Sequence, residues 1–279
     1  MATILIAGCG AIGLELAKQL ANLGHQVTGL KRHPPNQTQA NLQFFAADLT
    51  QADSLRNLNT HFEVVYFILS AGNRNESDYQ EIYHTGLNNL IAHFAEAEQT
   101  PQWFFVSSTS VYAQDAGEWL DENSEAAPVN PTSQWIRQAE QRITALHPSN
   151  IVVRLAGIYG PGREYLLRMA RSGVAIQQHP PYYTNRIHAA DCVGVLEFLL
   201  TQSLAGKALE QYYLASDDQP VPLWEVISWL AEQLGCAAPE AKSVTAPYSM
   251  NKRCDNGKLK ALGYQFRYPH FKVGYAELL

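Results

Sequence analysis

The sequence predicts an α/β protein, in which a doubly wound parallel Rossmann sheet is followed by a smaller mixed C-terminal subdomain. Short apolar runs alternate with amphipathic stretches from the N-terminus to Leu155, a pattern typical of a sheet covered by helices on both faces. A glycine-rich turn directly follows the first apolar run, and beyond Gly162 the alternation loosens. We therefore expect a Rossmann domain over residues 1–156 and a substrate-binding subdomain over residues 157–279, partly interleaved with the first.

The individual elements follow from local patterns. Thr3–Ala7 is uniformly apolar, as in a strand buried on both faces, and Ala11–Leu23 has the apolar spacing of a helix that Gly24 can end. Further strands are expected at His25–Leu30, Phe44–Ala46, Val64–Leu69, Trp103–Ser107, Ile151–Leu155 and Gln211–Leu214. Further helices are expected at Ser54–Leu58, Tyr79–Ala97, Trp135–Leu146, Tyr165–Arg171, Asp191–Thr201 and Leu223–Leu234.

Composition excludes several classes of protein. Of the 279 residues 46% are hydrophobic and 16% charged, which allows a large core and argues against general disorder. The net charge of −6 argues against nucleic-acid and anionic-membrane partners. The four cysteines form no Cys-x-x-Cys pair, so neither a disulfide framework nor a metal site is indicated. Without a signal peptide or a membrane-length apolar run, the expected location is the cytoplasm, and the expected partner is a small-molecule substrate.

The segment from Gly8 to Gly13 reads Gly-Cys-Gly-Ala-Ile-Gly, a G-x-G-x-x-G that leaves a strand and opens a helix. Gly8 permits the tight turn, Gly10 lets a pyrophosphate approach the backbone, and Gly13 lets helix and strand pack closely. The helix N-terminus adds free N–H groups for the phosphates. We predict a dinucleotide here, against the alternative of a structural turn without ligand. The predicted contacts in the turn are Gly8, Gly10, Ala11, Ile12 and Gly13.

The end of the second expected strand predicts the type of dinucleotide. An NAD enzyme usually places a carboxylate there for the ribose 2′-hydroxyl. This chain has Lys31 and Arg32 instead, and no acidic residue occurs between Glu15 and Asp48. A guanidinium can hold a 2′-phosphate with two hydrogen bonds, so we predict NADP, with NAD as the alternative if both cations are merely solvated.

Four further segments together resemble the extended short-chain dehydrogenase/reductase superfamily, specifically its NAD-dependent epimerase/dehydratase family. They are Asp48-Leu49, the strand and turn at 105–112 (Phe-Val-Ser-Ser-Thr-Ser-Val-Tyr), the segment at 154–162 ending in Tyr-Gly-Pro-Gly, and Arg186-Ile-His188 with Asp191. The resemblance runs nearly end to end. It implies an NAD(P)-dependent enzyme, with cofactor contacts that extend to Asp48, Leu49, Ser70, Ala71 and Tyr159.

In that family a serine or threonine, a tyrosine and a lysine act together, the tyrosine as acid and base. The resemblance places the serine at Ser108, with Thr109 and Ser110 facing the substrate. Aligning on Glu140, the glutamate that usually closes the Tyr-x-x-x-Lys motif, puts Thr132 at the tyrosine and Ile136 at the lysine. The proton-transfer pair is therefore missing from this helix.

Other residues could contribute to a site. Arg163 and Arg186 are candidates for an anionic group of the substrate, against a surface or structural role. The proton source could be Tyr159, Tyr182, Tyr183 or His188. A Tyr-x-x-x-Lys does occur at Tyr248–Lys252, but far from the helix that follows the serine strand, so we interpret it as coincidental. A hydrolase triad of Ser108, His188 and Asp191 lacks the G-x-S-x-G elbow.

Two hypotheses remain open at this point. The first is an NAD(P)-dependent epimerase, dehydratase or reductase with an atypical active site, acting on a small hydroxyl- or carbonyl-bearing compound such as a sugar derivative. The second is a catalytically silent NADP-binding regulator or sensor. The sequence leaves open the substrate, whether hydride transfer occurs and what replaces the missing pair. It also leaves the oligomeric state open, although the helices at Tyr79–Ala97 and Trp135–Leu146 occupy places where relatives form a homodimer.

Overall fold

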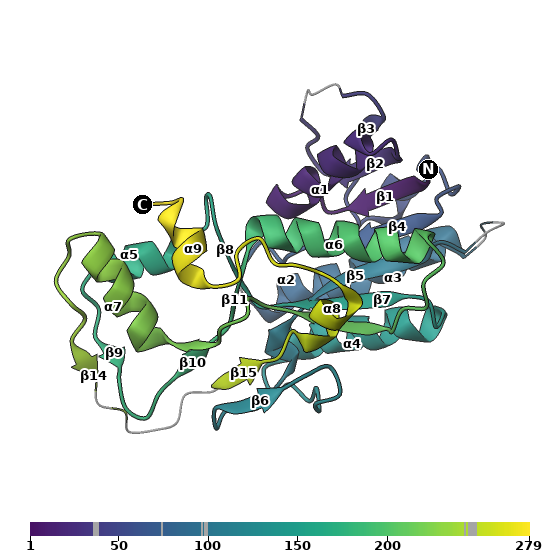
Figure 1. Cartoon of the computed structure of the whole chain (residues 1–279). Coiled ribbons are helices and arrows are strands. Elements are labelled where there is room, and N and C mark those ends of the chain that lie inside the picture. The colour runs from purple at the N-terminus through teal and green to yellow at the C-terminus, as the bar shows by residue number, and fades with distance from the viewer. Residues whose placement is uncertain (36–38, 74, 96, 98–99, 243, 245–249) are drawn as a thin grey trace. The chain divides into compact units, whose positions relative to one another are not determined.

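The computed structural model describes residues 1–279 except 36–38, 74, 96, 98–99, 243 and 245–249. The described chain divides into two compact units (Figure 1). Unit 1 comprises Met1–Val111, Ala127–Val153 and Leu196–Tyr212, and unit 2 comprises Tyr112–Ala126, Arg154–Val195 and Tyr213–Leu279. The chain therefore passes between the units several times. One of these crossings lies between Val153 and Arg154.

A seven-stranded sheet with the spatial order β12-β7-β5-β4-β1-β2-β3 organises the described chain. The strands are β1 (Thr3–Ala7), β2 (Gln26–Lys31), β3 (Leu42–Ala46), β4 (Val64–Phe67), β5 (Gln102–Ser108), β7 (Ile151–Leu155) and β12 (Tyr212–Ala215). The pairs β1–β2, β1–β4, β2–β3 and β4–β5 are parallel. The order reverses on either side of β1, as in a doubly wound sheet, so the predicted Rossmann fold class is confirmed.

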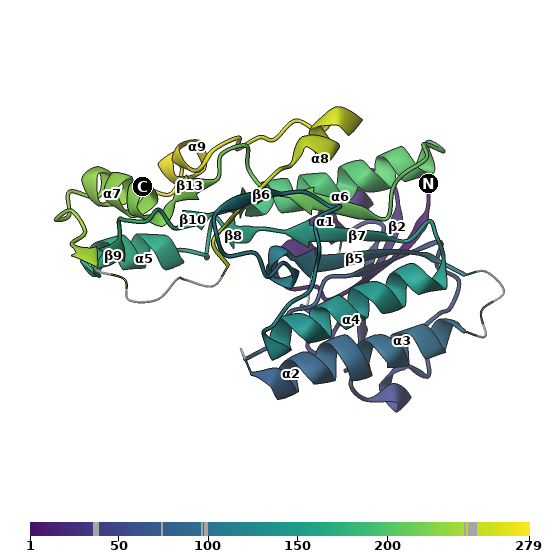
Figure 2. The same cartoon turned by 90° about the horizontal axis from the view of Figure 1, so that it is seen from below.

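Helices cover this sheet on both faces. Figure 2 shows α3 and α4 on one side of β5 and β7, and α6 on the opposite side. The helical elements of this part of the chain are α1 (Ala11–Asn22), the 3₁₀ turns η1 (Ala52–Leu55) and η3 (Thr109–Val111), α2 (Glu76–Gln80), the π-helical η2 (Glu81–Gly86), α3 (Leu87–Phe94), α4 (Pro131–Leu146) and α6 (Ala189–Leu204). The hydroxyl of Tyr66 in β4 donates to the carbonyl of Leu196 in α6 at 3.0 Å, which fastens this helix to the sheet.

Among the helices that begin earlier than their apolar spacing indicated, two have starts that are set by polar caps. The helix expected at Tyr79–Ala97 begins at Glu76, where the Asn75 side chain accepts from the backbone N–H of Asp78. The helix expected from Trp135 begins at Pro131, a residue favoured in the first turn, and Asn130 caps it. The first of these helices is also not uniform, since its middle turns are π-helical.

Unit 2 contains short paired strands that the sequence did not reveal, because two or three residues are too few to show a period. The parallel pairs are β6 (Glu118–Leu120) with β15 (Lys252–Cys254), β8 (Gly157–Tyr159) with β11 (Arg186–His188), and β9 (Ile176–Gln177) with β14 (Ala241–Lys242). The antiparallel pair is β10 (Tyr183–Thr184) with β13 (Val221–Pro222). The remaining helices are α5 (Tyr165–Arg171), α7 (Leu223–Gln233), α8 (Gly257–Leu262) and α9 (Phe271–Ala276).

The core of unit 2 lies where α5, α7 and α9 gather (Figure 1). Leu167 of α5, Leu230 of α7 and Phe271 of α9 are all buried in it, and the ring of Trp229 meets Phe271 edge-on. Across the ranges that the structure describes, no helix is both long enough and apolar enough to cross a membrane.

Candidate functional site

The three glycines of the first turn differ in whether the surrounding structure requires a glycine. Gly8 has a φ of +107°, and a Cβ there would lie 2.3 Å from the carbonyl oxygen of Ile68. A Cβ at Gly13 would lie 2.2 Å from the carbonyl oxygen of Gly8. Gly10 differs, because its φ of −75° suits any residue and no described atom lies within 4 Å of its Cβ position. Packing therefore requires Gly8 and Gly13, whereas Gly10 leaves the start of α1 open to an approaching group.

A pocket of about 490 Å³ opens beside this turn, entirely within unit 1. It lies at the carboxyl ends of β1, β2, β3 and β4, the edge at which doubly wound sheets bind ligands. The predicted cofactor residues that line it are Gly8, Gly10, Lys31, Arg32, Asp48, Leu49 and Ser70. Gly13 and Ile12 lie in the first turn of α1 and are buried, so they act through packing.

The pocket has charged groups of both signs. Lys31 and Arg32 stand at the end of β2, and His33, which the sequence argument did not single out, lines the same wall. Asp48 is held in place because its Oδ1 accepts from the backbone N–H of Thr50 at 3.0 Å and from the Thr50 hydroxyl at 2.9 Å. Lys31 and Arg32 are thus adjacent cations in this wall, and the Asp48 carboxylate has a fixed direction.

Cys9 lies in the glycine turn but has the properties of a packing residue. Its side chain is buried, and burial raises the pKa of the thiol to about 12, so the sulfur is neutral at physiological pH. A Cβ at Gly29 in β2 would lie 2.6 Å from the Cys9 sulfur. The glycine in the neighbouring strand therefore makes room for this thiol.

Two side chains from the helix that contains the π-helical turns hold the backbone of the pocket wall. The hydroxyl of Tyr83 donates to the carbonyl of Leu69 at 2.9 Å, and Asn89 Nδ2 donates to the carbonyl of Leu49 at 2.8 Å. Sequence reasoning missed both, because the π-helical turns shift the register that an α-helical period would assign. Such turns are frequent at functional sites.

Ser108 ends β5, where its Oγ accepts from the backbone N–H of Ser110 at 3.1 Å. This arrangement leaves the hydroxyl proton of Ser108 able to donate to a ligand oxygen. Thr109 and Val111 are buried in the following 3₁₀ turn.

Helix α4 offers no titratable group at Thr132 and Ile136, the two positions to which the family resemblance assigned the tyrosine and the lysine. Ile136 is 4% exposed and lies one turn before the buried Glu140, on the same helix face. Thr132, one turn earlier still, donates its hydroxyl to Asn130 Oδ1 at 2.8 Å within the helix cap. On the face of α4 that contains Glu140, the two preceding turns therefore carry an aliphatic residue, Ile136, and a residue of the helix cap, Thr132.

The candidates in the second half of the chain lie in unit 2 and are mostly internal. Tyr159 is 3% exposed, its ring stacks on Tyr275 at 4.6 Å, and burial raises the pKa of its hydroxyl. Burial likewise lowers the pKa of His188, whose Nδ1 accepts from the backbone N–H of Ala190 at 3.2 Å. Arg186 is also buried, whereas Arg163 is exposed.

Two residues of the motifs that the sequence analysis set aside have structural partners. The Asp191 carboxylate accepts from the backbone N–H groups of Arg267 and Tyr268, both at 2.9 Å. Lys252 is buried and donates to the carbonyl of Tyr112 at 2.6 Å, and burial lowers the pKa of its ammonium group to about 8. Tyr248, the other end of the coincidental motif, lies outside the described residues.

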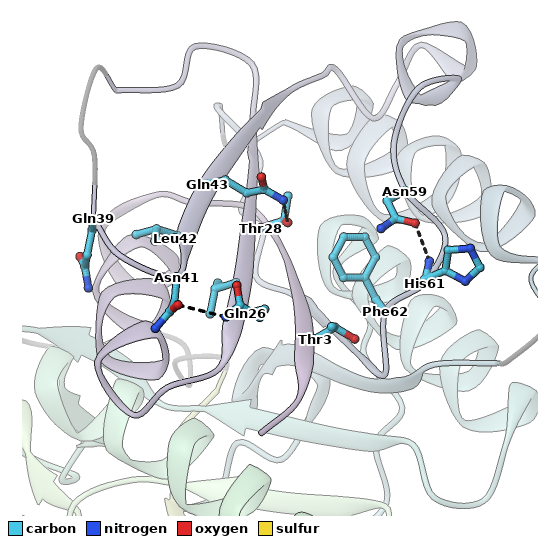
Figure 3. Close-up of a pocket in the computed structure, with 11 residues that line it drawn as sticks. Thr3, Gln26, Thr28, Gln39, Asn41, Leu42, Gln43, Asn59, His61 and Phe62 are labelled. Carbon is cyan, nitrogen blue, oxygen red and sulfur yellow. Dashed lines mark hydrogen bonds between the residues drawn. The ribbon is translucent and has the colours of Figure 1, made fainter.

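A second hollow in unit 1, of about 280 Å³, lies at the opposite ends of the strands (Figure 3). Its polar lining is already paired, because Gln26 donates to Asn41 and Gln43 donates to Thr28, each at 3.0 Å. None of the residues that line it is Asp, Glu, Lys or Arg. The amino ends of a doubly wound sheet are not its ligand-binding edge, so the pocket beside the glycine turn is the candidate site.

The doubly wound sheet and the pocket at its switch point define an α/β protein of the Rossmann class. The chain belongs to the NAD dependent epimerase/dehydratase family, whose model matches residues 4–214. A solved structure from Methylobacillus flagellatus, described as that of a candidate NAD-dependent epimerase/dehydratase, is 35% identical. The alignment covers 99% of this chain and 97% of that one, with a TM-score of 0.83.

Two further relatives span the same length. Protein YeeZ of Escherichia coli strain K12 is 24% identical over 276 residues, which are 96% of this chain and 97% of YeeZ. The UDP-glucose 4-epimerase of Thermus thermophilus, solved in complex with NAD, is 18% identical with a TM-score of 0.75. That alignment covers 98% of this chain and 96% of the epimerase, and the likeness is one of fold.

Proposed function

We propose that the pocket of unit 1 binds NADP, and that the protein is a reductase- or epimerase-like member of its family acting on a small hydroxyl- or carbonyl-bearing compound. The main observation in support of a bound dinucleotide is the glycine at position 10. Neither its backbone angles nor any described neighbour requires a glycine, so an external group that approaches the turn closely explains it best.

The preference for NADP rests on the end of β2. Lys31, Arg32 and His33 line the pocket where a ribose 2′-substituent would lie, and β2 carries no carboxylate that could bind a free 2′-hydroxyl. Asp48 and Leu49 on the adjacent wall would hold the adenine, and the first turn of α1 would hold the pyrophosphate.

When bound, the nicotinamide supplies hydride exchange with a substrate carbon. The chain itself would contribute Ser108, whose free hydroxyl proton can polarise a substrate oxygen, with Thr109 and Ser110 beside it. The proton cannot come from positions 132 and 136 of α4, because threonine and isoleucine do not titrate in the required range. We propose a sugar derivative as the substrate class, in line with the sugar nucleotide named for the Thermus relative.

A second candidate function follows from that same helix. A protein that binds the dinucleotide but transfers no hydride, and reports cofactor state to a partner, needs the pocket of unit 1 and no acid–base pair. The buried Ile136 at the lysine position favours this reading, because an aliphatic side chain there cannot lower the pKa of a neighbouring hydroxyl.

Cofactor titration tests the proposal. Calorimetry with NADPH, NADP, NADH and NAD is expected to show tighter binding of the 2′-phosphorylated forms. Arg32→Gln should weaken NADPH binding by roughly tenfold or more, the effect of losing a charge-assisted hydrogen bond, and leave NADH binding nearly unchanged. Arg142→Gln, on the exposed side of α4, is the matched control. Tighter binding of NADH than of NADPH would contradict the assignment.

A second measurement separates the two functions. NADPH oxidation is followed by absorbance against a panel of sugar aldehydes, ketones and nucleotide sugars, with Ser108→Ala as the comparison. Turnover that falls in the Ser108→Ala variant while NADPH affinity is retained supports the enzyme. Full NADPH affinity with no turnover on any compound of the panel supports the sensor.

A further inference from the structure

Unit 2 contains a group of buried polar side chains that lack partners for several of their polar atoms. Arg186, Asp217 and Tyr275 are 3%, 1% and 0% exposed. Among the described residues no hydrogen-bond partner exists for Nε and Nη2 of Arg186, Oδ2 of Asp217 or the hydroxyls of Tyr159 and Tyr275. Buried polar groups in native proteins are almost always bonded to protein or to ordered water, because leaving them unpaired costs free energy.

These atoms form one cluster, to which strands β8 and β11, the residues after β12, and helix α9 contribute. The backbone N–H of Asp217 donates to the carbonyl of Arg186 at 2.6 Å. The rings of Tyr159 and Tyr275 stack at 4.6 Å, and the Tyr159 hydroxyl lies directly against Gly274, where a Cβ would be 2.1 Å from it. We call Tyr159, Arg186, Asp217 and Tyr275 the polar cluster.

The charges of the polar cluster interact with one another. Burial raises the pKa of Asp217 to about 7, and the Arg186 guanidinium acts in the opposite direction. Burial also raises the pKa of Tyr275 to about 12, again opposed by Arg186. The other titratable groups that face Asp217 are Asp218, Asp191 and Cys254. The charge of Arg186 therefore acts on the carboxyl group of Asp217 and on the hydroxyls of both tyrosines.

We propose that the polar cluster is a buried binding site for water, in which ordered water bridges the free edge of Arg186, Oδ2 of Asp217 and the two tyrosine hydroxyls. An anion in this space would face Asp217, and a cation would face Arg186. Water can donate to the carboxylate and accept from the guanidinium at once, and a buried water typically makes about three such bonds. The Nε and Nη2 of Arg186 form one edge of the guanidinium, which suits a shared acceptor.

The bridged cluster fastens the C-terminal helix. Arg186 is already oriented by Thr184, which accepts from its Nη1 at 2.5 Å, and its guanidinium lies over the ring of Phe271 in α9 at 5.3 Å. Water between Arg186 and Tyr275 adds a polar link between β11 and α9 beside this stacking contact. Arg186 then acts as an internal anchor, and the exposed Arg163 is the better candidate for an anionic ligand.

The test uses substitutions that remove a hydroxyl and keep the ring. For the full-length protein, Tyr275→Phe and Tyr159→Phe are each expected to lower Tm by roughly 2–4 °C, the shift that loss of one bridged hydrogen bond produces in a chain of this size. Tyr165→Phe, at a ring that is 63% exposed, is the control and should leave Tm unchanged. If the hydroxyls had no partner at all, phenylalanine would raise Tm or leave it as it is, and the proposal would fail.

A crystal structure gives the direct readout. Ordered water within hydrogen-bond distance of Arg186 Nε and of the Tyr275 hydroxyl is expected in the unmodified protein, and the water nearest Tyr275 is expected to be lost or displaced in Tyr275→Phe. A dry cluster, or a direct Arg186–Asp217 contact that leaves no room for water, overturns the proposal.

Discussion

The hydroxyl of Ser107 in β5 donates a 2.5 Å hydrogen bond to Oε1 of Glu140 in α4, and Glu140 is 0% exposed. The second carboxylate oxygen accepts from Nη1 of Arg137 at 2.8 Å. This buried carboxylate fixes the rotation of α4 against the strand that ends in Ser108. Ile136 and Thr132 lie one and two turns before Glu140, so the same bond decides which side chains α4 presents toward the end of that strand.

Removing the carboxylate should destabilise the protein. Glu140→Ala leaves the Ser107 hydroxyl and the Arg137 guanidinium without this partner and is expected to lower the free energy of unfolding by about 3 kcal/mol. Glu140→Gln, which keeps a hydrogen-bond acceptor, should lose less than half as much. Urea denaturation of both variants measures the difference. If the two variants were equally stable, the acceptor that Glu140→Gln retains would contribute nothing to stability, and the prediction would be wrong.

Gly10 and Gly13 should separate binding from folding. Gly13→Ala places a methyl group against the Gly8 carbonyl and should cost about 2 kcal/mol of stability or more. Gly10→Ala meets no described atom and should cost less than about 1 kcal/mol, yet weaken dinucleotide binding roughly tenfold or more by blocking the backbone. Thermal melts and NADPH titration of the two variants check this. Unchanged NADPH affinity in Gly10→Ala would remove the main support for the proposed site.

Asn89 should affect the cofactor pocket without touching the ligand. Its hydrogen bond to the Leu49 carbonyl holds the pocket wall, so Asn89→Ala is expected to weaken NADPH binding by about fivefold through a looser wall. Asn88→Ala is the matched control, because the side-chain hydrogen bond that the structure describes for Asn88 runs to the exposed His84 ring at 3.5 Å and not to the pocket wall. Affinities measured by calorimetry decide the case, and equal values for the two variants would rule out a positioning role.

Asp217 should give the protein a pH-dependent stability. Its pKa is about 7 when folded, raised from 3.8, so the folded state binds the proton more tightly than the unfolded state. The associated stability is fully present below pH 3.8 and is lost as the pH rises to about 7. The slope in this window is at most about 1.4 kcal/mol per pH unit. Asp217→Asn should flatten that part of the curve, and an unchanged slope in urea melts from pH 4 to pH 8 would contradict the assignment.

Much of the sheet follows from sequence because its determinants are local. The apolar run Thr3–Ala7 and the glycines that follow it specify β1, the turn and α1, since each residue's role depends on neighbours a few positions away. The same locality places Lys31, Arg32 and Asp48 at strand ends, and parallel strands bring their carboxyl ends to one edge. Part of the pocket lining could therefore be named in advance, whereas His33 of the same wall was not singled out.

By itself, the sequence determined the Rossmann class, the glycine turn and the absence of a Tyr-x-x-x-Lys pair in α4. Only the tertiary structure decided that Asn89 and Tyr83 support the pocket wall, since their register depends on π-helical turns. It also decided that Arg186 is an internal group and not a surface cation. The physical reason is that burial and hydrogen-bond satisfaction depend on contacts between segments far apart in the chain, which no local pattern encodes.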